Sequence, residues 1–184
     1  MEDNNEYILK RINKYFFNQA LEKHNEILGD NSYRFFMLPL EFVSGMLESI
    51  KTEVDLKGKR FLDVGSGTGY ICGLAEQMGM IAEGIEMNPT LFEISTQMFP
   101  EIKFYNMNCN EFEKYGEYDI IYYWLPFRED RLKDDFKQKI EKEIKIGGFI
   151  LLGEEENQDA GKDSRFISLD GDKFHNKIWK KIGG

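Results

Sequence analysis

Residues 60–70 read RFLDVGSGTGY, and this stretch decides the fold. A mainly apolar strand runs directly into three glycines at alternate positions, Gly65, Gly67 and Gly69, and Asp63 stands two residues before the first of them. In an open α/β sheet, a glycine loop after the first strand lets a nucleotide-like ligand approach the backbone closely. The stretch therefore predicts a ligand site at the carboxyl end of a strand.

Strands and helices alternate from this stretch toward the C-terminus. We expect strands at residues 60–64, 81–86, 103–107, 119–124 and 149–153. Asn88 followed by Pro89 is typical of a helix N-cap and first turn, and a long helix should end at the glycines 147 and 148. The alternation predicts an α/β fold: a mainly parallel, doubly wound sheet of about seven strands with helices on both faces.

The two ends of the chain are expected to differ from this pattern. Residues 1–58 should form a helical extension, with one helix ending before Gly29 and another following Pro39, and residues 59–184 should form the core domain. Residues 166–169 indicate a strand that enters a hairpin. Apolar residues between 172 and 182 lie four apart, which fits a strand and a helix equally well, so both remain open.

Composition narrows the class of protein. A chain of 184 residues, 41% of them hydrophobic, suits one domain with a real core. It has no apolar run of about 18 residues, which a membrane-spanning helix would need. Its N-terminal residues also lack the basic region followed by an apolar region that is typical of a signal peptide. We therefore expect a cytoplasmic protein without a membrane partner. Two cysteines and two histidines favour neither a disulfide framework nor a metal site. A net charge of −9 disfavours a protein whose whole surface binds the phosphates of nucleic acid.

The spacing of the glycine loop separates two kinds of cofactor. A dinucleotide-binding loop has a third glycine three residues after the second, where this chain has Tyr70. The observed pattern is D-x-G-x-G-x-G. It resembles motif I of the class I, Rossmann-like S-adenosylmethionine-dependent methyltransferases, and the resemblance extends from about residue 59 to the C-terminus. The alternative is a glycine-rich turn that only serves tight packing of a strand on a helix.

This resemblance implies S-adenosyl-L-methionine as the cofactor. The loop residues Gly65, Ser66, Gly67 and Gly69 would surround its methionine part. Asp63 would hold the amino group, directly or through water.

Three further positions are implied to bind the adenosine part of the cofactor. Glu86 ends the second strand, 23 residues past Asp63, where an acid accepts hydrogen bonds from ribose hydroxyls. Met87 would pack on the adenine. After the third strand the family often has an aspartate that accepts from the adenine amino group; this chain has Asn108, whose carbonyl oxygen can also accept. Cys109 would offer its backbone N–H.

Residues 122–127, YYWLPF, follow the fourth strand and would face the methyl group. Similar enzymes that methylate amino groups of nucleic acids or of glutamine carry Asn/Asp/Ser-Pro-Pro-Tyr/Phe there, and only Pro126 and Phe127 match. Trp124 stands where the polar acceptor should be, so an adenine-N6-type mechanism is not supported. Tyr123, Trp124 and Phe127 would instead form an aromatic wall for the substrate, or belong to the core.

Other segments carry separate hypotheses. Glu154–Glu156 follow the fifth strand and could form an acidic rim that attracts an amine substrate, or a solvated loop. Residues 35–39 could form a lid over the cofactor or simply cover the sheet. Asp119 starts the fourth strand, at the end away from ligands, and should be structural.

Three functions follow from these residues. The first is methyl transfer to a nitrogen or oxygen of a small molecule or protein, without a recognisable general base. The second is a non-catalytic cofactor-binding or regulatory domain, since the motif after the fourth strand is degenerate. The third is an RNA methyltransferase, which a basic cluster favours: Lys173, Lys177, Lys180 and Lys181.

Overall fold

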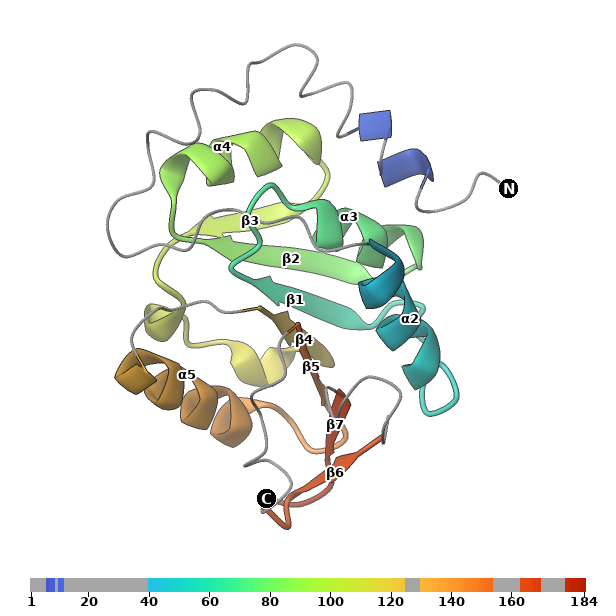
Figure 1. Ribbon diagram of the computed structural model, residues 1–184, viewed down its shortest axis with the longest axis vertical. Coiled ribbons are helices and arrows are strands. Elements are labelled where there is room, and N and C mark those ends of the chain that lie inside the picture. The colour runs from blue at the N-terminus through green and yellow to red at the C-terminus, as the bar shows by residue number, and fades with distance from the viewer. Residues whose placement is uncertain (1–5, 9, 12–39, 125–129, 154–162, 170–177) are drawn as a thin grey trace.

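The computed structural model describes residues 6–8, 10–11, 40–124, 130–153, 163–169 and 178–184 (Figure 1). These residues form a seven-stranded sheet in the order β3-β2-β1-β4-β5-β7-β6. The strands are β1 Arg60–Val64, β2 Ile81–Glu86, β3 Lys103–Asn106, β4 Ile120–Tyr123, β5 Phe149–Leu152, β6 Phe166–Ser168 and β7 Ile178–Lys181. Strands β1 to β5 pair in parallel, whereas β7 is antiparallel to β5 and to β6.

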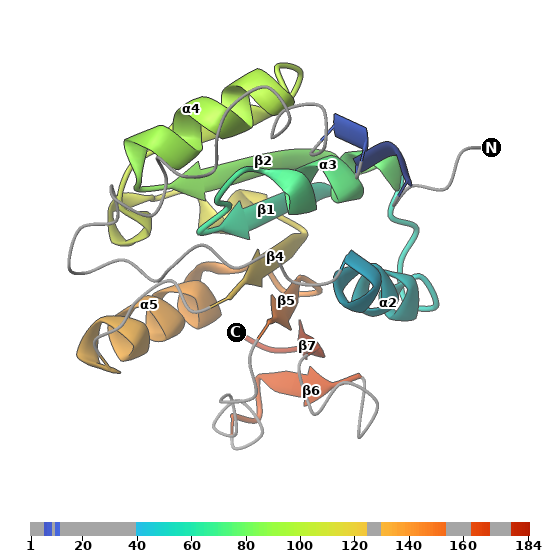
Figure 2. The ribbon, with the colours of Figure 1, turned by 45° about the horizontal axis from the view of Figure 1, so that its top comes forward.

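Helices cover both faces of this sheet, as the sequence predicted. The helices are α2 Leu40–Ile50, α3 Tyr70–Gln77, α4 Pro89–Met98 and α5 Asp130–Glu143, with short 3-10 turns η2 Cys109–Glu111 and η3 Tyr115–Glu117. Helices α2, α3 and α4 lie on one face, and α5 lies on the other (Figure 2). The expected doubly wound α/β sheet is therefore confirmed.

Local sequence signals set the helix boundaries. The Asn88 side chain accepts hydrogen bonds from the backbone N–H groups of Thr90 and Leu91, at 3.0 and 3.2 Å, and Pro89 occupies the first turn of α4. This arrangement satisfies N–H groups that have no partner inside the helix, which confirms the predicted cap. Helix α2 buries its predicted apolar face: Val43, Met46, Leu47 and Ile50.

The strands alternate between two hydrophobic cores. In β4 Ile120 and Tyr122 face the core beneath α2, α3 and α4, while Ile121 faces the core beneath α5. The same alternation in β1 and β5 leaves both faces apolar, which is typical of a parallel sheet with helices on both sides. Residues of α2 share the first core with β1 and α3, so this part of the predicted extension packs directly on the sheet.

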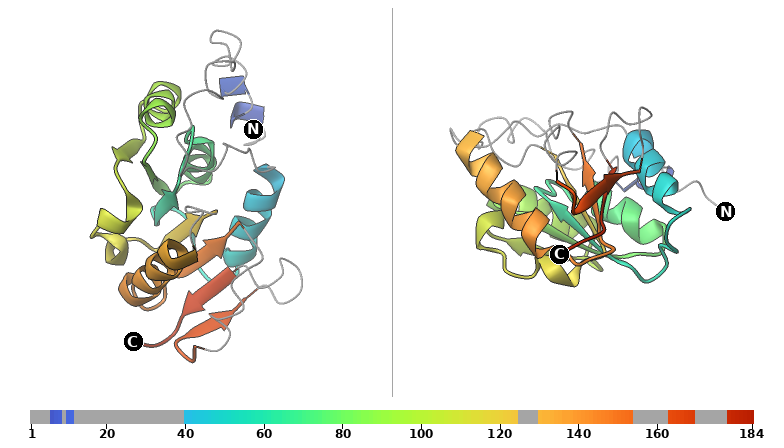
Figure 3. Two further views of the ribbon diagram at one scale, coloured as in Figure 1. Left: turned by 60° about the vertical axis from the view of Figure 1, so that its left-hand side comes forward. Right: turned by 90° about the horizontal axis from the view of Figure 1, so that it is seen from below.

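The structure decides the open choice between strand and helix for residues 178–182, whereas residues 172–177 lie outside the described ranges. Residues 178–181 are strand β7, and Figure 3 shows that β6 and β7 form the sheet edge remote from β3. Ile178 joins one core and Trp179 the other, as strand alternation requires. A spacing of four is even, so it suits a period of two as well as a helical turn, and periodicity could not decide.

The order of the strands defines where a ligand can bind. From β1 the chain moves outward to β2 and β3 and then returns to β4 on the other side of β1. At such a switch point, the loops at the carboxyl ends of the strands separate and leave room for a ligand. The glycine loop lies at this point, directly after β1. Within the described ranges, the helices are all too short or too polar to cross a membrane.

Candidate functional site

The glycine loop has an unusual backbone conformation. Gly65, Gly67 and Gly69 have φ angles of +78°, +54° and +79°. These angles lie in the left-handed region, which side chains with a Cβ atom rarely adopt. The backbone N–H groups of Gly65 and Ser66 both donate to the Ile85 carbonyl oxygen at 2.9 Å, so the loop is tied to β2.

The space around a Cβ atom differs between two of these glycines, Gly65 and Gly69. A Cβ atom at Gly65 would meet nothing within 4 Å in the described part of the chain, so the backbone there is open. A Cβ atom at Gly69 would lie only 2.6 Å from the Phe104 ring. The packing interpretation therefore accounts for Gly69, whereas Gly65 leaves an open backbone where a ligand can approach.

Glu86 lies beside this loop and is almost fully buried. Its Oε2 atom accepts a hydrogen bond of 2.8 Å from the Gly67 N–H, and its Oε1 atom accepts one of 2.7 Å from the Asn88 N–H. Burial raises the pKa of the carboxyl group, although these backbone donors oppose the rise. A carboxylate oxygen has two lone pairs, so each oxygen can still accept from a ribose hydroxyl.

Asp63 is also buried, at 2% exposure, near the end of β1. Burial and, to a smaller extent, the charge of Glu86 raise the pKa of its carboxyl group to about 8, while a contact from Cys72 lowers it. That contact joins Cys72 Sγ and Asp63 Oδ2 at 3.9 Å, which is a weak hydrogen bond. A buried carboxyl group with such weak partners is suited to receive a cationic group.

The predicted adenine contacts lie at the carboxyl ends of β2 and β3. Met87 is 48% exposed, which leaves its side chain available, and Cys109 is buried. The Asn108 Oδ1 atom accepts from the Asn110 N–H at 3.0 Å and caps η2. The predicted acceptor is thus already engaged, although a carbonyl oxygen has a second lone pair.

One residue of this region was missed by sequence reasoning. Asn106 Nδ2 donates to the carbonyl oxygens of Glu86 and Met87, at 2.9 and 3.2 Å. It therefore holds the end of β2 against the end of β3. The sequence did not indicate this contact, because Asn106 lies directly opposite Glu86 only through the pairing of β3 with β2.

The predicted aromatic wall is divided by strand alternation. Tyr123 faces the α5 side, where its ring packs edge-on against Phe136 with centroids 5.2 Å apart. Trp124 packs on the opposite core, against Gly153, where a Cβ atom would lie 2.7 Å from the Trp124 side chain. Trp124 is thus on the same face as Asp63, whereas Tyr123 is not. Phe127 lies outside the described residues.

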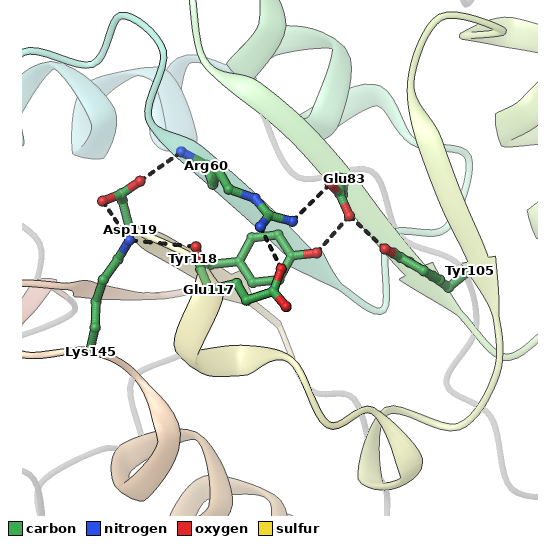
Figure 4. Close-up of polar contacts among 7 residues, drawn as sticks. All are labelled: Arg60, Glu83, Tyr105, Glu117, Tyr118, Asp119 and Lys145. Carbon is green, nitrogen blue, oxygen red and sulfur yellow. Dashed lines mark hydrogen bonds and ion pairs between the residues drawn. The ribbon is translucent and has the colours of Figure 1, made fainter.

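A separate polar network lies toward the amino ends of the strands, away from the glycine loop (Figure 4). Glu83 accepts hydrogen bonds from Tyr118 Oη at 2.6 Å and from Tyr105 Oη at 2.8 Å, and it pairs with Arg60. Asp119 accepts from the Arg60 N–H at 2.8 Å and pairs with Lys145 at 2.9 Å. These groups satisfy one another at the amino ends of the strands, so the predicted structural role of Asp119 is confirmed.

Several predicted segments lie outside the described residues: the acidic rim at 154–156, the apolar segment 35–39, Pro126, Lys173 and Lys177. The other two lysines of the basic cluster have partners. Lys180 pairs with Glu53 at 2.9 Å. Lys181 is 4% exposed and donates to three carbonyl oxygens near the end of α5.

Comparison with known proteins adds to this geometry. Neither a family model nor a curated protein matches the sequence. Solved structures do match. An RNA methyltransferase from Salinibacter ruber, in complex with S-adenosyl-L-homocysteine, is 18% identical with a TM-score of 0.55, over 80% of this chain and 92% of that chain.

Other solved structures that match are also S-adenosylmethionine-dependent methyltransferases. An S-adenosylmethionine-dependent methyltransferase from Thiobacillus denitrificans, also in complex with S-adenosyl-L-homocysteine, is 18% identical with a TM-score of 0.51, over 78% of this chain and 54% of that chain. One from Clostridium acetobutylicum is 12% identical with a TM-score of 0.54, over 62% of this chain and 50% of that chain. This chain spans only 54–63% of the length of three further solved structures that it matches. The chain therefore has the Rossmann-like fold of the S-adenosylmethionine-dependent methyltransferases.

Proposed function

We propose that this protein binds S-adenosyl-L-methionine and transfers its methyl group to a nitrogen or oxygen atom of a small molecule or protein. One observation carries the proposal: the open glycine loop lies between two buried carboxyl groups, Asp63 and Glu86, at the switch point of the sheet. The combination provides a close backbone approach, a site for an ammonium group and a site for ribose hydroxyls.

The residues present fit this cofactor. The open backbone at Gly65 leaves room for the methionine part, and the weakly partnered Asp63 would accept from its ammonium group. Glu86 would accept from the ribose hydroxyls, while Met87, Asn108 and the Cys109 N–H would contact the adenine. When bound, the cofactor supplies a methyl group already activated by the sulfonium charge.

The chain itself would act mainly by alignment. Holding two reactants in line contributes on the order of 7–11 kcal/mol, so methyl transfer to an amine can proceed without a dedicated base. Trp124 lies at the end of β4 on the Asp63 face, and its indole ring would form one wall of the acceptor site. An aromatic face of this kind suits a planar or cationic acceptor.

RNA is the second candidate acceptor. The match to the Salinibacter ruber RNA methyltransferase favours it, because it covers 92% of that chain. The net charge of −9 and the engagement of Lys180 and Lys181 count against it. A non-catalytic cofactor-binding domain is the third candidate, and it predicts tight binding without transfer.

Two experiments test the proposal in sequence. Calorimetric titration of the full chain should show binding of S-adenosylhomocysteine and no binding of NAD; tight NAD binding alone would overturn the proposal. Methyl-labelled S-adenosylmethionine is then incubated with the protein and with separate pools of small molecules, proteins and RNA. Label in the first or second pool supports the proposal. Label in RNA only, or in no pool, replaces it with the second or third candidate.

A further inference from the structure

The Tyr122 hydroxyl is a buried polar group that the proposed contacts do not use. Tyr122 lies on β4 directly opposite Asp63 on β1 in the parallel register. It is 3% exposed, and its Oη atom has no hydrogen-bond partner among the residues that the structure describes. Leaving such a group unpaired costs about 1–3 kcal/mol, so a partner is expected in the working state of the protein.

The surroundings of this hydroxyl indicate what kind of partner fits. Tyr122 points to the α3 side of the sheet, where Asp63 and Tyr70 are its electrostatic neighbours. Burial raises its pKa, so the hydroxyl keeps its proton and can donate as well as accept. Asp63 can only accept when ionised. Together the two side chains offer an acceptor and a donor at one place, which is the complement of an ammonium group beside a carboxylate.

We propose that Tyr122 is a further cofactor-binding residue, which hydrogen-bonds the amino-acid end of S-adenosylmethionine beside Asp63. This inference rests on the proposed function, because it assigns a second contact to the same cofactor. Phenylalanine would fill the same apolar space, so packing alone does not explain the hydroxyl. Ser66 Oγ and Thr68 Oγ1, in the glycine loop, are likewise buried without a partner in the described ranges. The unpaired hydroxyls thus gather around the loop and the strand next to it.

The test compares Tyr122→Phe with the unchanged chain on two ligands. S-adenosylhomocysteine carries the amino-acid end, whereas 5′-methylthioadenosine has the adenosine part without it. We expect Tyr122→Phe to bind S-adenosylhomocysteine about tenfold more weakly, as the loss of one hydrogen bond requires, and to bind 5′-methylthioadenosine unchanged. Its melting temperature should not fall, because the variant removes an unpaired hydroxyl.

Tyr118→Phe is the matched control. It removes a buried hydroxyl that donates to Glu83 in the polar network away from the glycine loop, so stability should fall while both affinities stay unchanged. Equal affinity of Tyr122→Phe and the unchanged chain for S-adenosylhomocysteine would overturn the inference, as would equal weakening for both ligands. If the unchanged chain binds neither ligand, the proposed function itself fails, and the two failures are distinguishable.

Discussion

The Glu86 carboxylate joins two segments of the proposed cofactor site, because Oε2 accepts from the Gly67 N–H at 2.8 Å while Oε1 accepts from the Asn88 N–H at 2.7 Å. Gly67 belongs to the glycine loop, and Asn88 caps α4. One side chain therefore positions the loop before α3 and the start of the next helix. The same two bonds fix the orientation of the carboxylate, whose remaining lone pairs would accept from the ribose hydroxyls of the proposed cofactor.

Replacing Glu86 by glutamine should damage both stability and binding. An amide has one acceptor oxygen, so its NH₂ group would face one of the two backbone donors and leave that donor unpaired. We expect a loss of about 1–3 kcal/mol in the free energy of unfolding. Affinity for S-adenosylhomocysteine should fall more than tenfold. Urea denaturation and calorimetry measure the two effects. Glu93→Gln, at an exposed position on α4, should change neither; wild-type affinity in Glu86→Gln would contradict the assignment.

A substitution at Gly65 separates backbone strain from ligand exclusion. Gly65→Ala should cost about 1 kcal/mol of stability, because φ is +78° and the described part of the chain leaves room for the methyl group. Its affinity for S-adenosylhomocysteine should fall at least tenfold, since the methyl group occupies the open side of the loop.

Gly147→Ala is a closely matched control. Gly147 has φ +83° and also has nothing within 4 Å of a Cβ atom in the described structure, but it lies before the amino end of β5, at the end of the sheet away from the glycine loop. Denaturation should show a similar loss of stability in both variants, and calorimetry should show weaker binding only in Gly65→Ala. Equal affinities in the two variants would place the ligand elsewhere.

The sequence predicted the fold well because its signals are local. Residues 60–64 and 81–86 form strands with the predicted bounds, and Asn88 caps the helix that follows. These elements are set by apolar runs, glycines and a capping residue, which need no knowledge of the rest of the chain. The C-terminal strand β7 was not predictable in this way, because its pairing with β5 supplies the hydrogen bonds that decide the choice.

The site was predictable in part. Asp63, Gly65 and Glu86 gather around one loop, as motif spacing indicated. The side-chain contacts that distant segments make could not be predicted: Asn106 reaches across to Glu86, and Tyr122 lies beside Asp63 only because β4 returns next to β1. Which face Tyr123 and Trp124 occupy likewise depends on strand register, and a one-residue shift would exchange them.

Asp63 should make the stability of the ligand-free protein depend on pH. Its carboxyl group has a pKa of about 8 in the folded protein, while the ordinary value is 3.8. Between these values the folded state binds more protons than the unfolded state, so stability should fall as pH rises from about 4 to 8. Titratable groups that face Asp63 are Glu86 on β2, Cys72 on α3 and Tyr122 on β4.

Asp63→Asn tests this expectation, because asparagine cannot ionise. At pH 8 the variant should be more stable than the unchanged chain by about 1–3 kcal/mol, and near pH 4 the two should be equal. Its affinity for S-adenosylhomocysteine should nevertheless fall at least tenfold. Calorimetry of the unchanged chain at pH 7, in buffers of different ionisation enthalpy, should show proton release on binding. Identical stability profiles for both chains would show that Asp63 is ionised in the free protein.

Lys181 should be a structural residue of the sheet edge. Its Nζ atom donates to the carbonyl oxygens of Glu141, Lys142 and Ile144 at 2.8–2.9 Å, at the end of α5. The last carbonyl groups of a helix have no donor inside the helix, so such bonds stabilise its end. Lys181→Met should therefore cost about 2–3 kcal/mol in urea denaturation. Lys180→Met removes a surface pair with Glu53 and a cation–π contact with Phe149, and it should cost at most about 1 kcal/mol. Both should retain their affinity for S-adenosylhomocysteine; equal stabilities would show that Lys181 does not hold α5.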